Sequence, residues 1–214
     1  MNLSKYKIKD NCRKNLSKYT IKAFSSIPKI NNPLILDMGC GTGVPILAIM
    51  EICNGFFYAV DSDESCLNLL KEKVTSLKYT NRINIINASI FDLDLFNVDF
   101  DIILADGLLN VIGFEKGMSV LLRYLKNFGY LVLHDELINV TKKGEIFKKN
   151  NLKLINSFEL NEDIWWNEYY SCLEKSIEYF NNDAIFKSEI NEILHFKKDP
   201  TLFKSIYYVL HYLS

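Results

Sequence analysis

The sequence predicts an α/β protein with a Rossmann-like, seven-stranded and mostly parallel sheet, an antiparallel last strand, and helices on both faces. Three observations carry this prediction. Short β-favouring runs alternate with helix-periodic segments five times between residues 34 and 134, the first run leads into a glycine-rich turn, and two further β-favouring runs follow. Parallel neighbours need right-handed crossover connections, which place the helices on both faces of the sheet.

The chain begins with a polar, lysine-rich segment, residues 1–30, that is expected to form a helical cap over the main body and to end at Pro28. Strand one follows at 34–37, and the turn after it contains three glycines. Pro45 opens the first core helix, 45–53, because a proline in the first helical turn loses no hydrogen bond.

The central elements follow from turn signals and apolar spacing. Asn54-Gly55 introduces a β-favouring run that ends at Asp61, and Ser62 or Asp63 can cap the next helix. The expected elements are strand 56–60, helix 63–78, strand 83–86, strand 100–104, a helix from about 115 to 126, and strand 130–134.

The last third completes one expected domain of 214 residues. It contains a short helix at 141–150, strand 152–160, a helical insertion at 161–200 and strand 205–213. The insertion is too long for a simple connection, so it is interpreted as a possible substrate lid.

Composition limits the classes of partner. The chain has 25 basic and 26 acidic residues and a formal net charge of -1, which gives no overall positive field for nucleic acid. No stretch approaches the roughly 20 apolar residues of a membrane span, so a cytoplasmic protein without a membrane partner is expected. The five cysteines show no metal-ligand spacing and are expected to be reduced thiols.

The glycine-rich turn indicates the kind of ligand. It has the spacing Gly39-x-Gly41-x-Gly43, whereas a dinucleotide site expects its third glycine one position later. Asp37 directly before the turn would repel a pyrophosphate, which favours a cationic ligand without phosphate. Asp61, at the end of strand two, is placed to bind the hydroxyls of a ribose. S-adenosylmethionine combines these properties.

Several of these segments carry a family resemblance. The chain resembles class I S-adenosylmethionine-dependent methyltransferases in the runs 35–43, 59–61, 87–93 and 122–132. More narrowly, residues 110–117 and the later Trp-x-x-Tyr-Tyr pattern resemble a group of type 11 methyltransferases.

The resemblance implies roles for residues at the carboxyl ends of the strands. The methionine part of the cofactor would be held by Asp37 and the turn residues Gly39, Cys40, Gly41 and Gly43, with Ala105 and Asp106 approaching its carboxylate or amine. Asp61 would bind the ribose, Ser62 would flank the adenine, and Ser89 and Ile90 would address the adenine edge. The family often has an acid at position 89, so a serine there makes that contact weaker or indirect.

Methyl transfer depends mainly on alignment, because a sulfonium is a good leaving group. A hydroxyl or carbon acceptor would also want a general base, for which His134, Asp135, Glu136, Tyr169 and Tyr170 are candidates. A structural role is as plausible as a catalytic one for His134, and exposed carboxylates are the favoured interpretation of the two acids.

The expected acceptor pocket lies on the loop after strand four, at the end of strand five and on the insertion. Its expected substrate-binding residues are Asn110, Glu115, Glu136, Trp165 and Trp166. Ordinary packing of the insertion is an equally good explanation of the two adjacent tryptophans.

A small-molecule acceptor is favoured over a macromolecule. The Asn-Pro-Pro-Tyr pattern of nucleic-acid N-methyltransferases is absent after strand four, and of the paired glutamates of a protein-arginine enzyme only Glu115 is near. Two alternatives stay open, a cofactor-binding partner or sensor without transfer activity and a nicotinamide-dependent oxidoreductase. A monomer or homodimer is expected, and the acceptor atom stays open.

Overall fold

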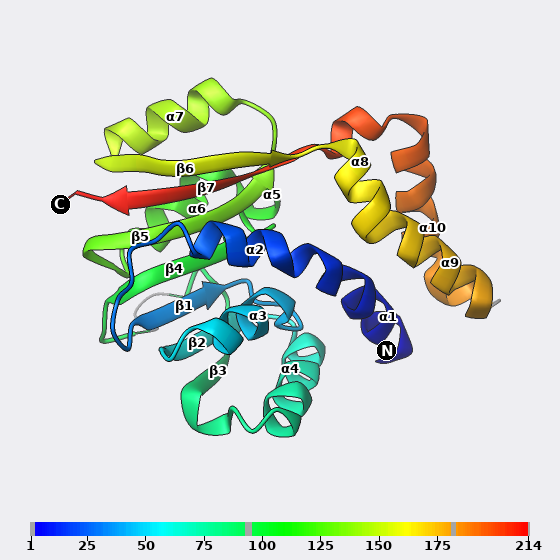
Figure 1. Cartoon of the computed structure of the whole chain (residues 1–214), viewed down its shortest axis with the longest axis horizontal. Coiled ribbons are helices and arrows are strands. Elements are labelled where there is room, and N and C mark those ends of the chain that lie inside the picture. Colours follow the sequence, from blue (N-terminus) through cyan, green and yellow to red (C-terminus); the bar gives the residue numbers. More distant parts are fainter. Residues whose placement is uncertain (1–2, 93–95, 181–182, 214) are drawn as a thin grey trace.

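The computed structural model describes residues 3–92, 96–180 and 183–213. A central sheet is covered on both faces by helices, and a further group of helices stands at one end of it (Figure 1). The strands are β1 (Leu34–Met38), β2 (Phe56–Asp61), β3 (Ile83–Asn87), β4 (Phe100–Asp106), β5 (Leu125–Glu136), β6 (Leu152–Leu160) and β7 (Ser205–Tyr212).

The helices alternate with these strands. The α-helices are α1 (Leu3–Arg13), α2 (Ser17–Phe24), α3 (Val44–Ile52), α4 (Glu64–Ser76), α5 (Leu109–Ile112), α6 (Phe114–Leu121), α7 (Val140–Lys149), α8 (Glu162–Trp165), α9 (Ser171–Phe180) and α10 (Asp183–Lys198). Short 3₁₀ segments are η1 (Lys14–Leu16), η2 (Thr80–Arg82) and η4 (Pro200–Phe203), and η3 (Trp166–Tyr170) is a π-helical turn.

The strand order is β3-β2-β1-β4-β5-β7-β6. The pairs from β3 to β5 are parallel, whereas β7 lies antiparallel between β5 and β6. The predicted seven-stranded, mostly parallel sheet with an antiparallel last strand is therefore confirmed. The order reverses beside β1, which places the crevice for a ligand outside the carboxyl ends of β1 and β4.

Two apolar cores hold the layers together. The first packs Ala23, Ile46 and Leu67 from α2, α3 and α4 on one sheet face, and the second packs Leu121 and Phe147 from α6 and α7 on the other. Because successive residues of a strand face opposite sides, each central strand supplies both cores. This double burial explains the continuous apolar runs of β1 and β4.

A third, smaller core joins the two ends of the chain. Leu16 packs with Leu173, Phe186 and Phe196, so that the amino-terminal helices and the insertion cover each other beyond the carboxyl ends of the strands. The expected cap 1–30 and insertion 161–200 are therefore in contact, and their role as a substrate lid stays a proposal.

The cysteine prediction is wrong for one pair. Cys12 of α1 and Cys172 of α9 form a disulfide with a Cα–Cα distance of 5.6 Å, while Cys40, Cys53 and Cys66 are free. The two residues are 160 positions apart, and only the packing of α1 against α9 brings them together. The positions of the two cysteines in the sequence do not indicate this contact.

The predicted helix from about 115 to 126 is too long. Helix α6 ends at Leu121, and β5 already begins at Leu125. Phe128 adopts a positive φ of 63° inside the strand, next to a register shift against β4 between Phe100 and Ile102. The expected turn at 127–129 is thus an irregularity within a longer strand.

In the part of the chain that the structure describes, no helix has the length and apolar character that crossing a membrane would require.

The disulfide between α1 and α9 should contribute to stability. Reduction is expected to lower the free energy of unfolding by about 2–4 kcal/mol, because it releases a constraint on the unfolded chain. Thermal unfolding with and without a dithiol reductant measures the effect. A Cys12→Ser/Cys172→Ser variant should be less stable and insensitive to the reductant, whereas Cys53→Ser should keep the full response. An equal loss of stability on reduction in the double variant and in Cys53→Ser would contradict a disulfide between Cys12 and Cys172.

Candidate active site

The turn after β1 brings the backbone close to the ligand crevice. Gly39, Gly41 and Gly43 have φ angles of 75°, 53° and 81°, a region that other residues rarely adopt. A Cβ on Gly43 would lie 2.3 Å from Leu70 Cδ1, so this position is also fixed by packing. At Gly41 a Cβ would meet nothing within 4 Å, which leaves open space for a ligand against the backbone.

Asp37 is a buried carboxylate without a partner. Its residue is 1% exposed, and neither of its oxygens accepts a hydrogen bond from any described residue. Burial, followed by the negative charges of Asp106 and Asp61, raises the pKa of Asp37 well above its usual value. A carboxylate held in this way is stabilised when a cation approaches it.

The neighbouring Cys40 is a structural thiol. Burial and the charges of Asp37 and Asp61 raise the pKa of the Cys40 thiol well above its ordinary value. The thiolate is the nucleophilic form, so this environment suppresses nucleophilic chemistry at Cys40.

Asp61 connects the ends of β1 and β2. Its Oδ2 accepts from the Gly41 amide at 2.7 Å, and its Oδ1 accepts from the Asp63 amide at 2.9 Å. Each carboxylate oxygen has a further lone pair, so Asp61 can still accept from hydroxyl groups. Ser62 beside it is exposed.

The turn after β3 is closed by its own residues. Ser89 Oγ accepts from the Phe91 amide at 3.2 Å, and the Ser89 amide donates to Asp92 Oδ2 at 2.8 Å. The hydroxyl of Ser89 therefore serves the turn, and Ile90 is half-buried beside it. Leu93, the last residue of the motif at 87–93, lies outside the described residues.

Asp106, at the end of β4, is the centre of a polar network. Its Oδ1 lies 2.8 Å from His134 Nδ1, and its Oδ2 accepts from the Tyr207 hydroxyl at 3.2 Å. Burial raises the pKa of Asp106, but His134, Arg13 and the Tyr207 hydroxyl outweigh it and lower the pKa below its usual value. Asp106 is therefore ionised at neutral pH, while Ala105 before it is buried.

Both ring nitrogens of His134 have partners. Nε2 lies 2.7 Å from Ser205 Oγ, which also accepts a hydrogen bond from Trp165 Nε1 at 3.0 Å. Ionised Asp106 can only accept, so His134 Nδ1–H donates to it, while Nε2 pairs with the Ser205 hydroxyl. The His134 ring also stacks on Tyr207 with centroids 4.1 Å apart. These contacts fix the ring in place.

A small cavity of about 40 Å³ adjoins this network. Asp106, His134 and Tyr207 line one side, and residues of the amino-terminal helices, α3 and the insertion close the rest. The further lining residues are Arg13, Leu16, Ser17, Thr20, Val44, Pro45 and Trp165. Helix α1 is also fixed to the glycine turn, since Asp10 accepts hydrogen bonds from Thr42 Oγ1 at 2.5 Å and from Lys73 Nζ at 2.5 Å.

A model of a protein family described as a methyltransferase domain matches residues 31–176. The chain belongs to this family. With its fold and structural neighbours, this makes it a class I S-adenosylmethionine-dependent methyltransferase. The narrower resemblance to the type 11 group stays a prediction.

Known proteins resemble the methyltransferase in sequence and in fold. A demethylmenaquinone methyltransferase of Bacteroides fragilis is 26% identical over 178 residues, which span 80% of this chain and 71% of the relative. Among solved structures, the [4+2]-cyclase SpnF has a TM-score of 0.77 at 12% identity and covers 92% of this chain and 81% of its own. A Geobacter sulfurreducens methyltransferase in complex with S-adenosylhomocysteine has a TM-score of 0.71 at 12% identity, with 90% of each chain covered.

The cofactor of the methyltransferase is S-adenosylmethionine. The residues at the crevice fit this molecule: the unpartnered Asp37 suits its positive charge, Gly41 leaves room against the backbone, and Asp61 has lone pairs for hydroxyl groups. These three residues suit a ligand that has no pyrophosphate, in agreement with the spacing of the glycines.

The predicted catalytic tyrosines are not among the residues that line the cavity beside Asp106. Tyr169 and Tyr170 are buried in the third core, and the Tyr170 hydroxyl donates to Glu192 Oε1 at 2.9 Å. Burial and the charges of Glu192 and Glu189 raise the pKa of Tyr169 to about 12 against the opposing effect of Arg13. Burial and Glu192 raise the pKa of Tyr170. Both are weak acids with structural contacts, so their catalytic role stays an untested prediction.

The predicted substrate residues divide between two places. Trp165 lines the cavity beside Asp106, whereas Trp166 stacks on Phe196 with ring centroids 5.8 Å apart. The remaining predicted residues, Asn110, Glu115 and Glu136, line a different cavity between α5–α6 and α7.

Several site residues escaped the sequence interpretation. Arg13 and Thr20 belong to helices that were expected only to cap the domain, and Ser205 and Tyr207 belong to a strand that was expected only to pack. Side chains alternate between the two sheet faces along 205–213, so the sequence could have predicted that Ser205 and Tyr207 share one face. The strand register that places Tyr207 opposite His134 cannot be predicted from the sequence in this way.

Replacing Asp37 by asparagine should separate stability from cofactor binding. The raised pKa means that ionised Asp37 costs stability as the pH rises above about 4, the ordinary carboxyl value. The free Asp37→Asn chain should therefore melt at a higher temperature at neutral pH, with the gain vanishing below about pH 4. Its affinity for S-adenosylhomocysteine should fall about tenfold or more, because a charged contact is lost. Calorimetric titration and thermal unfolding provide both readouts, and unchanged affinity would remove Asp37 from the site.

Asp61→Ala should weaken S-adenosylhomocysteine binding by about 1.5–3 kcal/mol through the loss of charge-assisted hydrogen bonds. Calorimetry measures the change, and Glu64→Ala, an acid in the first turn of α4, is the matched control. Equal affinities of the Asp61 and Glu64 variants would exclude a ribose contact at Asp61.

Proposed function

We propose that the enzyme transfers a methyl group from S-adenosylmethionine to a small-molecule acceptor whose reactive group enters the cavity beside Asp106. The observation that supports the proposal is the small volume of this cavity and its cover of helices. Helices α1 and α2 and Trp165 of the insertion surround it, and its volume of about 40 Å³ accepts one functional group at a time. This cover of helices favours a small acceptor over a polymer.

Two further observations support a small acceptor. The formal net charge of -1 provides no field to hold nucleic acid. The Bacteroides fragilis relative is named for demethylmenaquinone, which is a small molecule. The proposal does not extend to that substrate.

Asp37, the turn 39–43 and Asp61 are proposed to hold the methionine and ribose parts of the cofactor, with Ala105 and Asp106 near the methionine end. Ser62, Ser89 and Ile90 are proposed to flank the adenine, with Ser89 contributing backbone groups because its hydroxyl serves the turn. When bound, the cofactor supplies an activated methyl group on a sulfonium.

The network around Asp106 is proposed to align the acceptor. Ionised Asp106 can accept a hydrogen bond from an N–H or O–H of the acceptor and so direct a lone pair at the methyl group. His134 is proposed as a positioning residue, because both of its ring nitrogens are already engaged and a general base needs a free lone pair. Arg13 supplies a positive charge on the cavity wall.

We also propose that the enzyme acts in the cytoplasm as a monomer or homodimer. The disulfide between Cys12 and Cys172 would then be the exception among its cysteines.

An assay with methyl-labelled S-adenosylmethionine tests the proposed acceptor class. Label should appear in a metabolite extract of molecules below about 1 kDa, and not in added RNA or protein. Asp106→Asn should lower kcat/KM about 10²-fold or more, because alignment and charge are both lost. Asp163→Asn on the insertion surface is the control. Label in a macromolecular fraction only would contradict the proposal.

A further inference from the structure

We propose that the protein has a second small-molecule site, between α5–α6 and α7, that binds a flat, apolar and uncharged molecule carrying a hydroxyl group. The cavity there has a volume of about 400 Å³, within the range of small-molecule pockets. Its location does not depend on the proposed acceptor. His134 and Asp135 are successive residues of β5, so they face opposite sides of the sheet, His134 towards Tyr207 and Asp135 towards α7.

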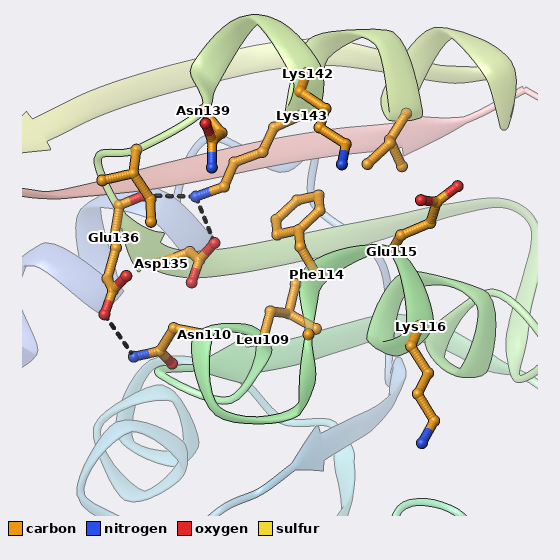
Figure 2. A pocket seen from close by; sticks show the side chains of 13 residues that line it. Leu109, Asn110, Phe114, Glu115, Lys116, Asp135, Glu136, Asn139, Lys142 and Lys143 are labelled. Carbon is orange, nitrogen blue, oxygen red and sulfur yellow. Dashed lines mark hydrogen bonds and ion pairs between the residues drawn. The ribbon is translucent and has the colours of Figure 1, made fainter.

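A buried ion pair forms the polar wall of this second cavity (Figure 2). Lys143 Nζ lies 2.6 Å from Asp135 Oδ2 and donates to the Glu136 carbonyl oxygen at 2.6 Å, and both charged side chains are almost fully buried. Burying such a pair is costly, and the cost is recovered only when the remaining hydrogen-bonding positions are also satisfied.

Two of these positions are unsatisfied. Asp135 is 4% exposed, which contradicts the expected exposed carboxylate, and its buried Oδ1 has no hydrogen-bond partner among the described residues. An ammonium has three N–H donors, and the two bonds above use two of those of Lys143. A single hydroxyl group satisfies both, because it can donate to Asp135 Oδ1 and accept from Lys143.

The rest of the wall selects the body of the ligand. The Phe114 ring lies beside the pair, with its centroid 5.1 Å from Lys143 Nζ, and Leu109, Ile138 and Ile146 add aliphatic surface. Aromatic and aliphatic walls favour a flat apolar molecule. The charged lining residues are Lys116, Lys142 and Lys143 against Glu115, Asp135 and Glu136. Because these charges cancel, the cavity has no net charge to select an ion.

The test uses 1-naphthol as the probe and 1-methoxynaphthalene, which has no hydroxyl donor, as its comparison. Both are titrated into the full chain and followed by ligand-observed NMR or calorimetry. We expect 1-naphthol to bind at least tenfold more tightly than the ether. Equal affinities, or no binding of 1-naphthol at millimolar concentration, would overturn the proposal.

Two variants locate the binding. Asp135→Leu/Lys143→Met replaces the whole pair by apolar groups, which avoids an uncompensated buried charge, and should abolish the preference for the hydroxyl. Ile138→Asp at the cavity rim should weaken both probes at least tenfold, whereas the matched variant Val140→Asp, at an exposed position of α7, should not.

S-adenosylhomocysteine affinity reports on the fold and on the cofactor site in every variant, and we expect it to be unchanged. If 1-naphthol binding survives both Asp135→Leu/Lys143→Met and Ile138→Asp, the probe binds elsewhere and the assignment is wrong. These readouts need no methyl transfer, so they fail or succeed independently of the proposed function.

Discussion

Two acids at the ends of neighbouring strands set the electrostatics of the site. Asp37 lies one residue before the end of β1 and Asp106 ends β4, and the surroundings of the two carboxylates differ. Asp106 has hydrogen bonds from Tyr207 and His134 that lower its pKa, whereas no described residue donates to Asp37 and its pKa is raised. An unpartnered buried carboxylate is a cost to the free chain, and a cationic cofactor is the partner that we propose offsets it. The free protein is thereby less stable than its packing alone would allow.

The network around Asp106 connects parts of the chain that are far apart in sequence. Thr20 of α2 contacts the Tyr207 hydroxyl at 2.9 Å, and Trp165 of the insertion reaches His134 through Ser205. The amino-terminal helices and the insertion therefore both contribute to the orientation of one carboxylate. Because α1 also contacts the glycine turn through Asp10, displacement of these helices would disturb both the glycine turn and the network around Asp106.

The sequence was sufficient for the sheet, because apolar runs and turn signals are local patterns. The proposed cofactor residues rest on local patterns of the same kind, the spacing of Gly39 to Gly43 and the acids near the strand ends. The network around Asp106 could not be predicted in this way, because it depends on the register of paired strands. Tyr207 lies opposite His134 only through the antiparallel pairing of β5 and β7, and Cys12 meets Cys172 only through the packing of α1 on α9. Such contacts depend on tertiary packing, which cannot be predicted from the pattern of a few neighbouring residues.

We propose that Asp37 gains its first partner when the cationic cofactor binds, and proton release on binding measures this. Calorimetric titration of S-adenosylhomocysteine in buffers of different ionisation enthalpy counts the protons released across a pH series. We expect the wild-type chain to release up to one proton per ligand, as the raised pKa of Asp37 returns towards its ordinary value, and Asp37→Asn not to do so. Identical proton release from the two proteins at every pH would contradict it.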